Sequence, residues 1–213
     1  MESTTVRAQE KESGRVEAFS DGVFAIAMTL LALDLKAPSL PNGMPIPGLS
    51  AAALETALAR QWPSYMAFIT SFFSILIMWV NHHAMFKLVR RVNVRLLMAN
   101  GLLLMVATIA PFSTNLVAEY FQSPGGRLAC LVYGGTFVLG SIAFNITWYV
   151  ITHDPGLLRH DAPESMITKI TRSYRNGVPI YLVAMVGAFI SVYVTMGICT
   201  ALWIYWSAVA RDA

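Results

Sequence analysis

Charged residues are scarce in this chain. Asp, Glu, Lys and Arg make up only 13% of its 213 residues, whereas 56% are hydrophobic and the mean hydropathy is +0.57. A soluble domain carries about 25% charged residues, so the composition excludes an ordinary soluble domain and is typical of a polytopic membrane protein. The net charge of +3 is small, and no nucleic-acid partner is expected.

Cysteine is scarce as well. Cys130 and Cys199 are the two in the chain, and both stand in apolar runs, which argues against a disulfide framework or a cysteine metal centre. We therefore expect no metal and no cofactor. A cleaved signal peptide is not expected either, because Asp21 and Asp34 bracket the first apolar run.

The apolar runs predict an all-α protein with six transmembrane helices. Spans at 16–35, 62–86, 96–120 and 128–151 are each long enough for a bilayer core about 30 Å thick. A Pro- and Gly-rich connection, 36–50, and an interfacial helix, 51–60, join the first two spans. The block 178–210 is interpreted as a helical hairpin that turns near 195–197, after a polar loop at 152–176. Residues 1–14 are expected to be a disordered cytoplasmic tail, followed by one transmembrane domain, 15–211.

The basic residues predict the orientation. If both termini are cytoplasmic, only Lys36, Arg60 and Arg127 of the 15 Lys and Arg lie on the outer side. Such an excess on the inner side follows the positive-inside rule. The sequence therefore predicts a multi-pass membrane protein with a cytoplasmic N-terminus. Five spans would misplace only Arg211, so the count does not separate five spans from six.

Polar residues at the start of the first span are its most unusual feature. They follow the pattern Arg15-x-x-x-Phe19-Ser20-Asp21, and polar groups in a membrane are costly and tend to be retained for function or assembly. Later spans carry three further motifs: Ser71-Phe-Phe-x-Ile75, Trp79-x-x-His82-His83-x-x-Phe86 and Pro111-Phe112-Ser-Thr114. Together these motifs resemble the transmembrane protein 175 family, potassium channels of lysosomes and bacteria. The resemblance is good over 15–120 and rests on the span pattern elsewhere.

The resemblance implies a bacterial plasma-membrane channel for K⁺, built as a homotetramer whose first helix lines a central pore. In the family, constrictions follow the motif aspartate at spacings that correspond here to Ile26, to Thr29 or Leu30, and to Leu33. The family lacks the Thr-Val-Gly-Tyr-Gly filter of ordinary potassium channels, as does this sequence. Modest selectivity is therefore expected.

The residues themselves support an apolar constriction. Ile26, Leu30 and Leu33 share one helix face, and copies around an axis would form stacked collars that can gate by dewetting. Thr29 would instead offer a hydroxyl ligand to a cation. The two candidates, Thr29 and Leu30, differ by about 100° around the helix. A stripe of small residues that includes Gly22 favours Leu30, but both stay open.

The polar motif is expected to be structural. Arg15 and Asp21 do not share a helix face, so partners should come from the second span, where Trp79, His82 and His83 are available. Adjacent histidines diverge around a helix and do not form a metal pair. A pH-sensing role for them stays open.

The outer ends of the first and third spans carry Asp34 and Glu119. Rings of acidic side chains at a channel mouth concentrate cations. The alternative is a solvated helix end in which Asp34 pairs with Lys36 or Arg60.

Two other functions compete with a channel. A secondary transporter or proton-coupled carrier would need a polar site at the membrane midplane or paired broken helices, for which only Pro111 is a hint. A membrane enzyme would need a convergent catalytic set, yet the ionisable residues of the spans gather at one end without a nucleophile. We expect no enzyme.

Overall fold

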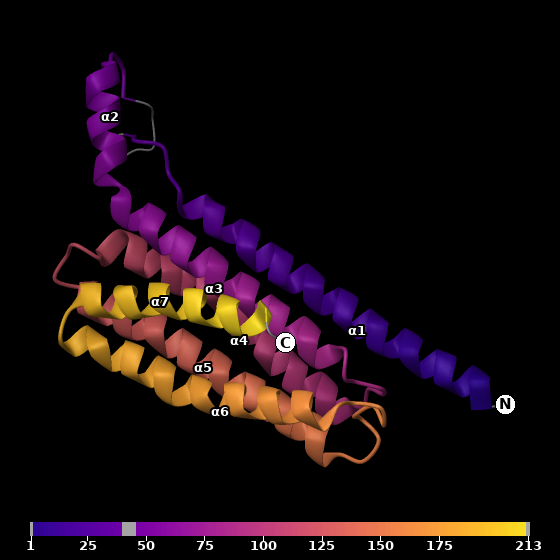
Figure 1. Cartoon of the computed structure of the whole chain (residues 1–213). Coiled ribbons are helices and arrows are strands. Elements are labelled where there is room, and N and C mark those ends of the chain that lie inside the picture. Colours follow the sequence, from indigo (N-terminus) through magenta and orange to yellow (C-terminus); the bar gives the residue numbers. More distant parts are fainter. Residues whose placement is uncertain (1, 40–45, 212–213) are drawn as a thin grey trace.

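The computed structural model describes residues 2–39 and 46–211, and their regular elements are helices (Figure 1). The long helices are α1 (Glu2–Leu31), α3 (Trp62–Phe86), α4 (Val94–Tyr120), α5 (Gly126–His153), α6 (Glu164–Val186) and α7 (Val192–Arg211), with the short helix α2 (Ala51–Arg60) between α1 and α3. Single 3₁₀ turns, η1 (Ala32–Asp34) and η2 (Gly187–Phe189), follow α1 and α6. The prediction of an all-α protein is confirmed.

Within the described residues, 4 helical segments are long and apolar enough to cross a membrane: Glu12–Asp34, Trp62–Phe86, Val94–Tyr120 and Gly126–His153. They match the first four predicted spans, and α2 matches the predicted interfacial helix. The apolar part of α7, Val192–Ile204, is shorter, and α6 is polar in its first half. The count of six spans therefore stays a prediction.

Two boundaries were predicted wrongly. The last hairpin turns at residues 187–191 instead of 195–197, and α6 begins at Glu164, inside the predicted loop. The first half of α6 buries only Ile170 and Tyr174, one helical turn apart, so few apolar residues mark it as a helix. Residues 2–14 are also helical, not disordered, because strong helix formers such as Ala, Glu, Gln, Lys and Arg dominate them.

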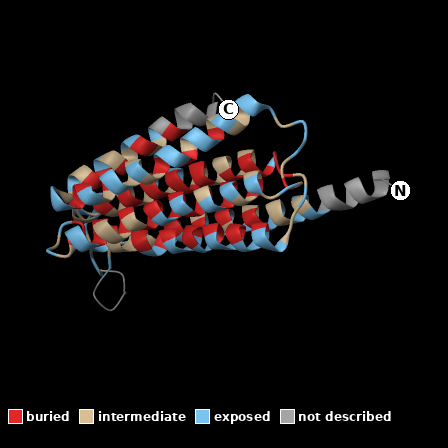
Figure 2. Ribbon diagram, turned by 90° about the horizontal axis from the view of Figure 1, so that it is seen from below, coloured by how far each residue is buried: buried red, intermediate tan, exposed pale blue. Residues whose placement is uncertain are grey.

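The helices pack side by side into one bundle, with α1 and α6 on opposite sides of it (Figure 1). The helix α1 packs on α3 and α4, α6 packs on α5 and α7, and α7 also packs on α3. Buried residues fill the space between the helices (Figure 2). The short helix α2 has no buried residue and leaves the bundle.

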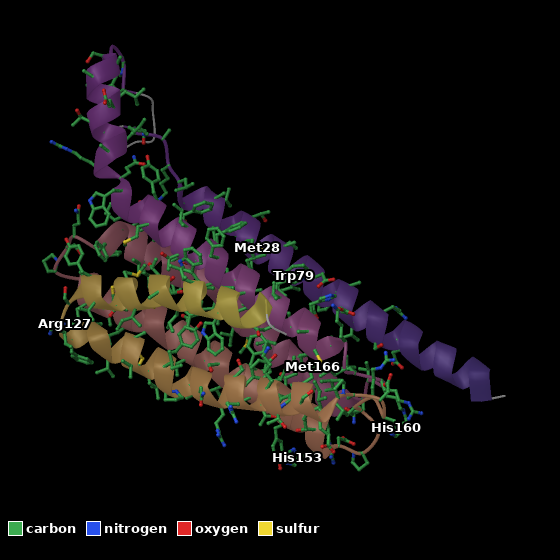
Figure 3. The ribbon with its side chains drawn as sticks, viewed as in Figure 1. Met28, Trp79, Arg127, His153, His160 and Met166 are labelled. Atoms are coloured by element: carbon green, nitrogen blue, oxygen red, sulfur yellow. The ribbon has the colours of Figure 1, made fainter. Side chains whose placement is uncertain are left out.

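The α3–α4 and α5–α6 connections meet at one end of the bundle. The Arg90 N–H donates to the Leu157 carbonyl (2.7 Å), and the Arg159 N–H donates to the Leu88 carbonyl (2.9 Å). We call this end, whose connections also carry Lys87 and Arg91, the basic end. Trp79 lies on the half of α3 nearer to it (Figure 3), and its indole is bonded to Asp21 of α1.

The contact between α5 and α6 is close because two glycines allow it. A Cβ on Gly134 would lie 2.8 Å from the Met185 Cα, and a Cβ on Gly177 would lie 2.5 Å from the Ser141 Oγ. Small residues bring helix backbones together in membrane proteins.

We expect Gly134→Ala to destabilise the protein by about 1–3 kcal/mol, because the Met185 backbone must move away. The apparent melting temperature in detergent measures this effect. Gly101→Ala is the matched control, since a Cβ there meets no atom within 4 Å. Equal melting temperatures for the two variants would contradict the close α5–α6 contact.

Candidate pore helix and its polar anchor

The helix α1 has one buried face and one exposed face. Its buried face, in contact with α3 and α4, consists of Ser20, Phe24, Ala27 and Leu31, each 0% exposed. These residues recur at the helical spacing of three and four. In its most apolar stretch α1 is only 22% buried, against 44–61% for the other candidate spans. Most of α1 is therefore uncovered by its own subunit.

The expected constriction residues lie on the uncovered side. Ile26 is 59% exposed, Leu30 40% and Leu33 71%, and Leu33 stands in the 3₁₀ turn η1, beyond the regular helix. Thr29 is also exposed, and its hydroxyl donates to the Ile26 carbonyl at 2.8 Å. The hydroxyl proton is thus engaged, while oxygen lone pairs remain to accept a cation or water. Both Thr29 and Leu30 face away from the bundle, so the choice between them stays open.

A buried chain of hydrogen bonds joins α1 to α4 and α3. The Asn100 Nδ2 donates to the Ser20 Oγ (3.0 Å), which itself donates to the Val16 carbonyl (2.9 Å). The His82 Nε2 lies 2.9 Å from the Asn100 Oδ1, and because that oxygen can only accept, Nε2 carries the proton. The His82 ring also stacks on Phe86 with ring centroids 4.3 Å apart. Ser20, Asn100 and His82 are 0–2% exposed, so no solvent competes for these bonds.

A second set of contacts joins α1 to α3 alone. The Trp79 indole Nε1 donates to the Asp21 Oδ1 at 2.8 Å, and Figure 3 shows Trp79 directed at α1. One turn further, the His83 Nδ1 lies 2.6 Å from the Glu17 Oε1. The Trp79 and His83 rings stack at 5.9 Å. We call these two contacts, together with the Ser20–Asn100–His82 chain, the polar anchor.

The structure does not bring every motif residue into the polar anchor. Arg15 and Phe19 are exposed, and among the described residues neither takes part in these hydrogen bonds. Sequence reasoning missed Asn100 and Glu17. The available signal was that Asn100 stands alone in the apolar run of α4, and an isolated polar residue in a span needs a partner.

Two polar contacts hold the other end of α1. The Asn115 Nδ2 donates to the Asp34 Oδ1 (2.8 Å), and the Lys36 Nζ lies 2.9 Å from the Glu119 Oε1. The hydrogen bond and the charge of Glu119 both raise the pKa of Lys36, which keeps this lysine protonated at neutral pH. Among the described residues Asp34 forms no ion pair with Lys36 or Arg60, the partners considered for a solvated helix end, although its charge also raises the pKa of Lys36.

Two further motif residues, Ser71 and Thr114, form a buried hydroxyl cluster with Tyr133. The Thr114 Oγ1 donates to the Ser71 Oγ (2.7 Å), and the Ser71 Oγ lies 3.0 Å from the Tyr133 hydroxyl. These contacts tie α4 to α3 and α5 in the half of the bundle away from the basic end. Because they involve hydroxyls only, the cluster holds no charge.

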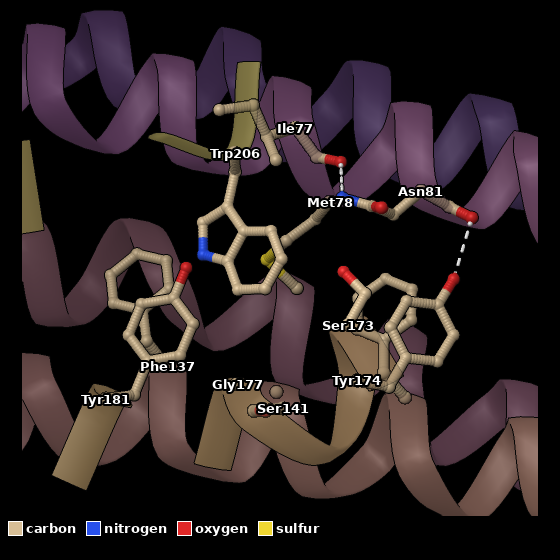
Figure 4. Close-up of a pocket in the computed structure, with 12 residues that line it drawn as sticks. Ile77, Met78, Asn81, Phe137, Ser141, Ser173, Tyr174, Gly177, Tyr181 and Trp206 are labelled. Atoms are coloured by element: carbon tan, nitrogen blue, oxygen red, sulfur yellow. Dashed lines mark hydrogen bonds between the residues drawn. The ribbon is translucent and has the colours of Figure 1, made fainter. Parts of the chain in front are cut away.

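A cavity of about 50 Å³ lies between α3, α5, α6 and α7. In Figure 4 the Tyr174 hydroxyl donates to the Asn81 carbonyl (3.1 Å), and the Asn81 Nδ2 donates to the Ile77 carbonyl (2.9 Å). The volume suits a few water molecules at most. No residue of α1 lines this cavity, so it is separate from the uncovered face of α1.

The described residues contain no group of three or more His, Cys, Asp or Glu side chains that could hold a metal ion. Cys130 and Cys199 are buried free thiols. The polar groups of α1 are therefore arranged to bond with neighbouring helices, and its uncovered face is mainly apolar.

Trp79→Phe should lower stability by about 1.5 kcal/mol, because it removes a hydrogen bond to a charged group and keeps the ring. For a chain of this length we expect a fall of about 3–6 °C in melting temperature. Trp62→Phe, at the other end of α3, is the control, because the Trp62 side chain makes ring contacts with Phe121 and Tyr193. If the two variants have the same melting temperature, the Trp79–Asp21 bond does not anchor α1.

Comparison with known proteins identifies the family. The family model described as endosomal/lysosomal potassium channel TMEM175 matches residues 15–111. A potassium channel from Chamaesiphon minutus is 45% identical over 199 residues, which are 93% of this chain and 95% of that protein. A potassium channel from Streptomyces collinus is 46% identical over 162 residues, 75% of each chain.

Structural similarity agrees with the sequence matches. The crystal structure of a lysosomal potassium-selective channel TMEM175 homolog from Chamaesiphon minutus superposes with a TM-score of 0.83 at 44% identity, covering 94% of this chain and 99% of that one. The human relative, named endosomal/lysosomal proton channel TMEM175, is 28% identical over 135 residues, 63% of this chain but only 27% of that protein. The predicted resemblance is confirmed, and the chain belongs to the TMEM175 family.

Proposed function

We propose that this chain is a subunit of a homotetrameric potassium channel in which α1 lines a central pore and K⁺ passes without coupling to another ion. The observation that carries the proposal is the apolar, uncovered face of α1 at Ile26, Leu30 and Leu33. Support also comes from the bacterial relatives, which are named potassium channels and match nearly the whole chain.

The composition of the uncovered face favours contact with other copies over contact with lipid. Gly22 and Ala25 are exposed on it beside Ile26, and so is the polar Thr29. Small residues let helices approach closely, whereas a lipid-facing surface gains nothing from glycine or a hydroxyl. Copies of α1 around one axis would cover this face in the assembly.

In such an assembly Ile26, Leu30 and Leu33 form stacked apolar collars over roughly 10 Å of the helix axis. A narrow apolar constriction excludes water until it widens, and this dewetting provides the gate. Thr29 remains the candidate for a hydroxyl ligand. Since no carbonyl-lined filter replaces the hydration shell, selectivity for K⁺ over other cations is modest.

The polar anchor fixes α1 against α3 and α4 at residues 17–21. Asp34 and Glu119 lie at the outer mouth of the proposed pore. The distribution of Lys and Arg supports a cytoplasmic basic end in the bacterial plasma membrane. A carrier is less well supported, because the buried cluster of Ser71, Thr114 and Tyr133 contains hydroxyls without a charge. Proton permeation is the second candidate, because animal relatives are named proton channels.

Flux from liposomes tests the function. Purified protein in K⁺-loaded liposomes should release K⁺ when a proton ionophore balances charge, and the release should need no pH gradient. Release that requires an opposing proton gradient would indicate a coupled carrier. A proton channel would instead show no K⁺ release in this assay, and it would take up protons, measured with a pH dye, when valinomycin replaces the proton ionophore and lets K⁺ leave in exchange.

Ile26→Asn should raise K⁺ flux several-fold and weaken discrimination against Na⁺, because an amide in the collar holds water in the constriction. Val183→Asn is the control, since Val183 is 62% exposed on α6, far from α1. Equal effects of the two substitutions would mean that Ile26 faces lipid.

Asp34→Asn should reduce inward K⁺ conductance by about twofold at low salt and have little effect at 1 M salt, because mouth charges act through screened attraction. Single-channel recordings measure this effect. The control is the double variant Lys36→Gln/Glu119→Gln, which removes one charge of each sign from an ion pair. Unchanged conductance in Asp34→Asn channels at low salt would rule out an acidic mouth.

A further inference from the structure

A groove of about 590 Å³ runs between α5 and α6 on the half of the bundle nearer the basic end. His153 lies at its mouth, on the side of the bundle away from α1 (Figure 3). The Trp148 indole Nε1 donates to the Thr171 Oγ1 at 2.8 Å, and Trp148 is only 4% exposed. This bond closes the floor of the groove and fixes α5 against α6.

Arg175 is the charged residue of the groove, and the described residues give it no partner. Its side chain is exposed, and among the described residues it makes no hydrogen bond or ion pair. No acidic residue lines the groove. Of the acids at the basic end, Asp154 accepts from the Asn93 Nδ2 (2.8 Å) and Asp161 pairs with Arg159 (3.1 Å), while Glu164 lies eleven residues before Arg175 on α6.

The position of Arg175 along α6 places its charge well inside the bundle from the basic end. Arg175 is eleven residues beyond Glu164, the start of α6, or roughly 16 Å along the helix from the basic end. Side chains on a helix lean toward its N-terminus, so the guanidinium reaches back toward the mouth. An arginine within a membrane is costly unless a counter-charge meets it.

The rest of the groove is mainly apolar along its length and amphipathic at its mouth; the Asn145 amide donates to the Ser141 and Tyr174 carbonyls. Ile142, Ile146 and Val178 form its inner wall, with Ile142 38% and Ile146 40% exposed. At the mouth, the Tyr149 ring stacks on His153 with centroids 4.0 Å apart. A molecule that fits this groove has an anionic head and a long apolar tail.

We propose that the α5–α6 groove binds an anionic glycerophospholipid of the leaflet at the basic end. The headgroup phosphate pairs with Arg175, and an acyl chain lies along Ile142, Ile146 and Val178. Basic pockets between transmembrane helices on the cytoplasmic side are suited to anionic lipid heads. A free phosphate would make no use of the apolar wall. A second copy of the chain is a poorer fit, because the uncovered face of α1 is on the opposite side. The site requires that α5 and α6 lie in a membrane, and it does not depend on ion conduction.

Native mass spectrometry of the purified full-length protein in detergent tests the site. Phosphatidylglycerol and phosphatidylcholine with identical acyl chains are titrated separately, and bound lipid per subunit is counted. We expect phosphatidylglycerol to bind more tightly. Arg175→Gln should weaken phosphatidylglycerol binding about tenfold, to the level of phosphatidylcholine, because a charge-assisted hydrogen bond is lost.

A second variant tests the apolar wall with the charge intact. Ile146→Trp fills the groove and should weaken binding of both lipids. Arg127→Gln is the matched control: this exposed arginine lies at the other end of α5, and the variant should bind phosphatidylglycerol like the unmodified protein.

Several results would overturn the proposal. Equal binding of the two lipids, or full phosphatidylglycerol binding in Arg175→Gln or Ile146→Trp, would remove the site. Competition by millimolar inorganic phosphate as strong as by phosphatidylglycerol would show a site for a free anion. A changed number of subunits in Arg175→Gln would show an interface between copies. Lipid binding by a protein that conducts no K⁺ would uphold the site and reject only the proposed function.

Discussion

The rest of the structure depends on one constraint: the polar residues that begin the first span must find partners inside the protein. A membrane offers no water to satisfy them. Ser20 reaches Asn100, and Asp21 accepts from the Trp79 indole. Together these bonds fix the orientation of α1 about its own axis. Rotating the helix by about 100° would bring Ile26 toward the bundle and take Ser20 out of it. The uncovered apolar face is therefore a consequence of the polar anchor.

Contacts at both ends of α1 strengthen this constraint. Asp34, in the turn η1 after α1, is held by Asn115 near the end of α4, and between this contact and the polar anchor α1 is fixed by apolar packing through Phe24, Ala27 and Leu31. Polar contacts are directional and set rotation and depth, whereas apolar packing tolerates small shifts. Motion of α1 is thus expected between the two sets of polar contacts, in the stretch that carries Ile26 and Leu30.

Much of the fold could be predicted because span ends are chemically marked. Trp62-Pro63 and Lys87 bracket α3, and its predicted bounds were correct. The start of α6 could not be predicted, because that half buries only one residue per turn and is otherwise polar. Similarly, depth in the membrane indicated that Asp21 should meet α3, but depth does not give the direction around a helix. Nothing in the sequence showed that Asn100 would lie between Ser20 and His82.

Asp21 and Arg175 present the same physical problem with two different solutions. Each is a charged residue on a helix of the bundle, and leaving either charge unpaired within a bilayer is costly. The counterpart of Asp21 is a donor on the neighbouring helix α3, so its contact holds the subunit together. The described residues offer no counterpart to Arg175, and the groove beside it continues into an apolar wall. The two sides of the subunit therefore differ: on the side at α1 the Asp21 carboxylate is bonded within the subunit beside an uncovered apolar face, and the side at α5 and α6 presents Arg175 to the phosphate of the proposed lipid.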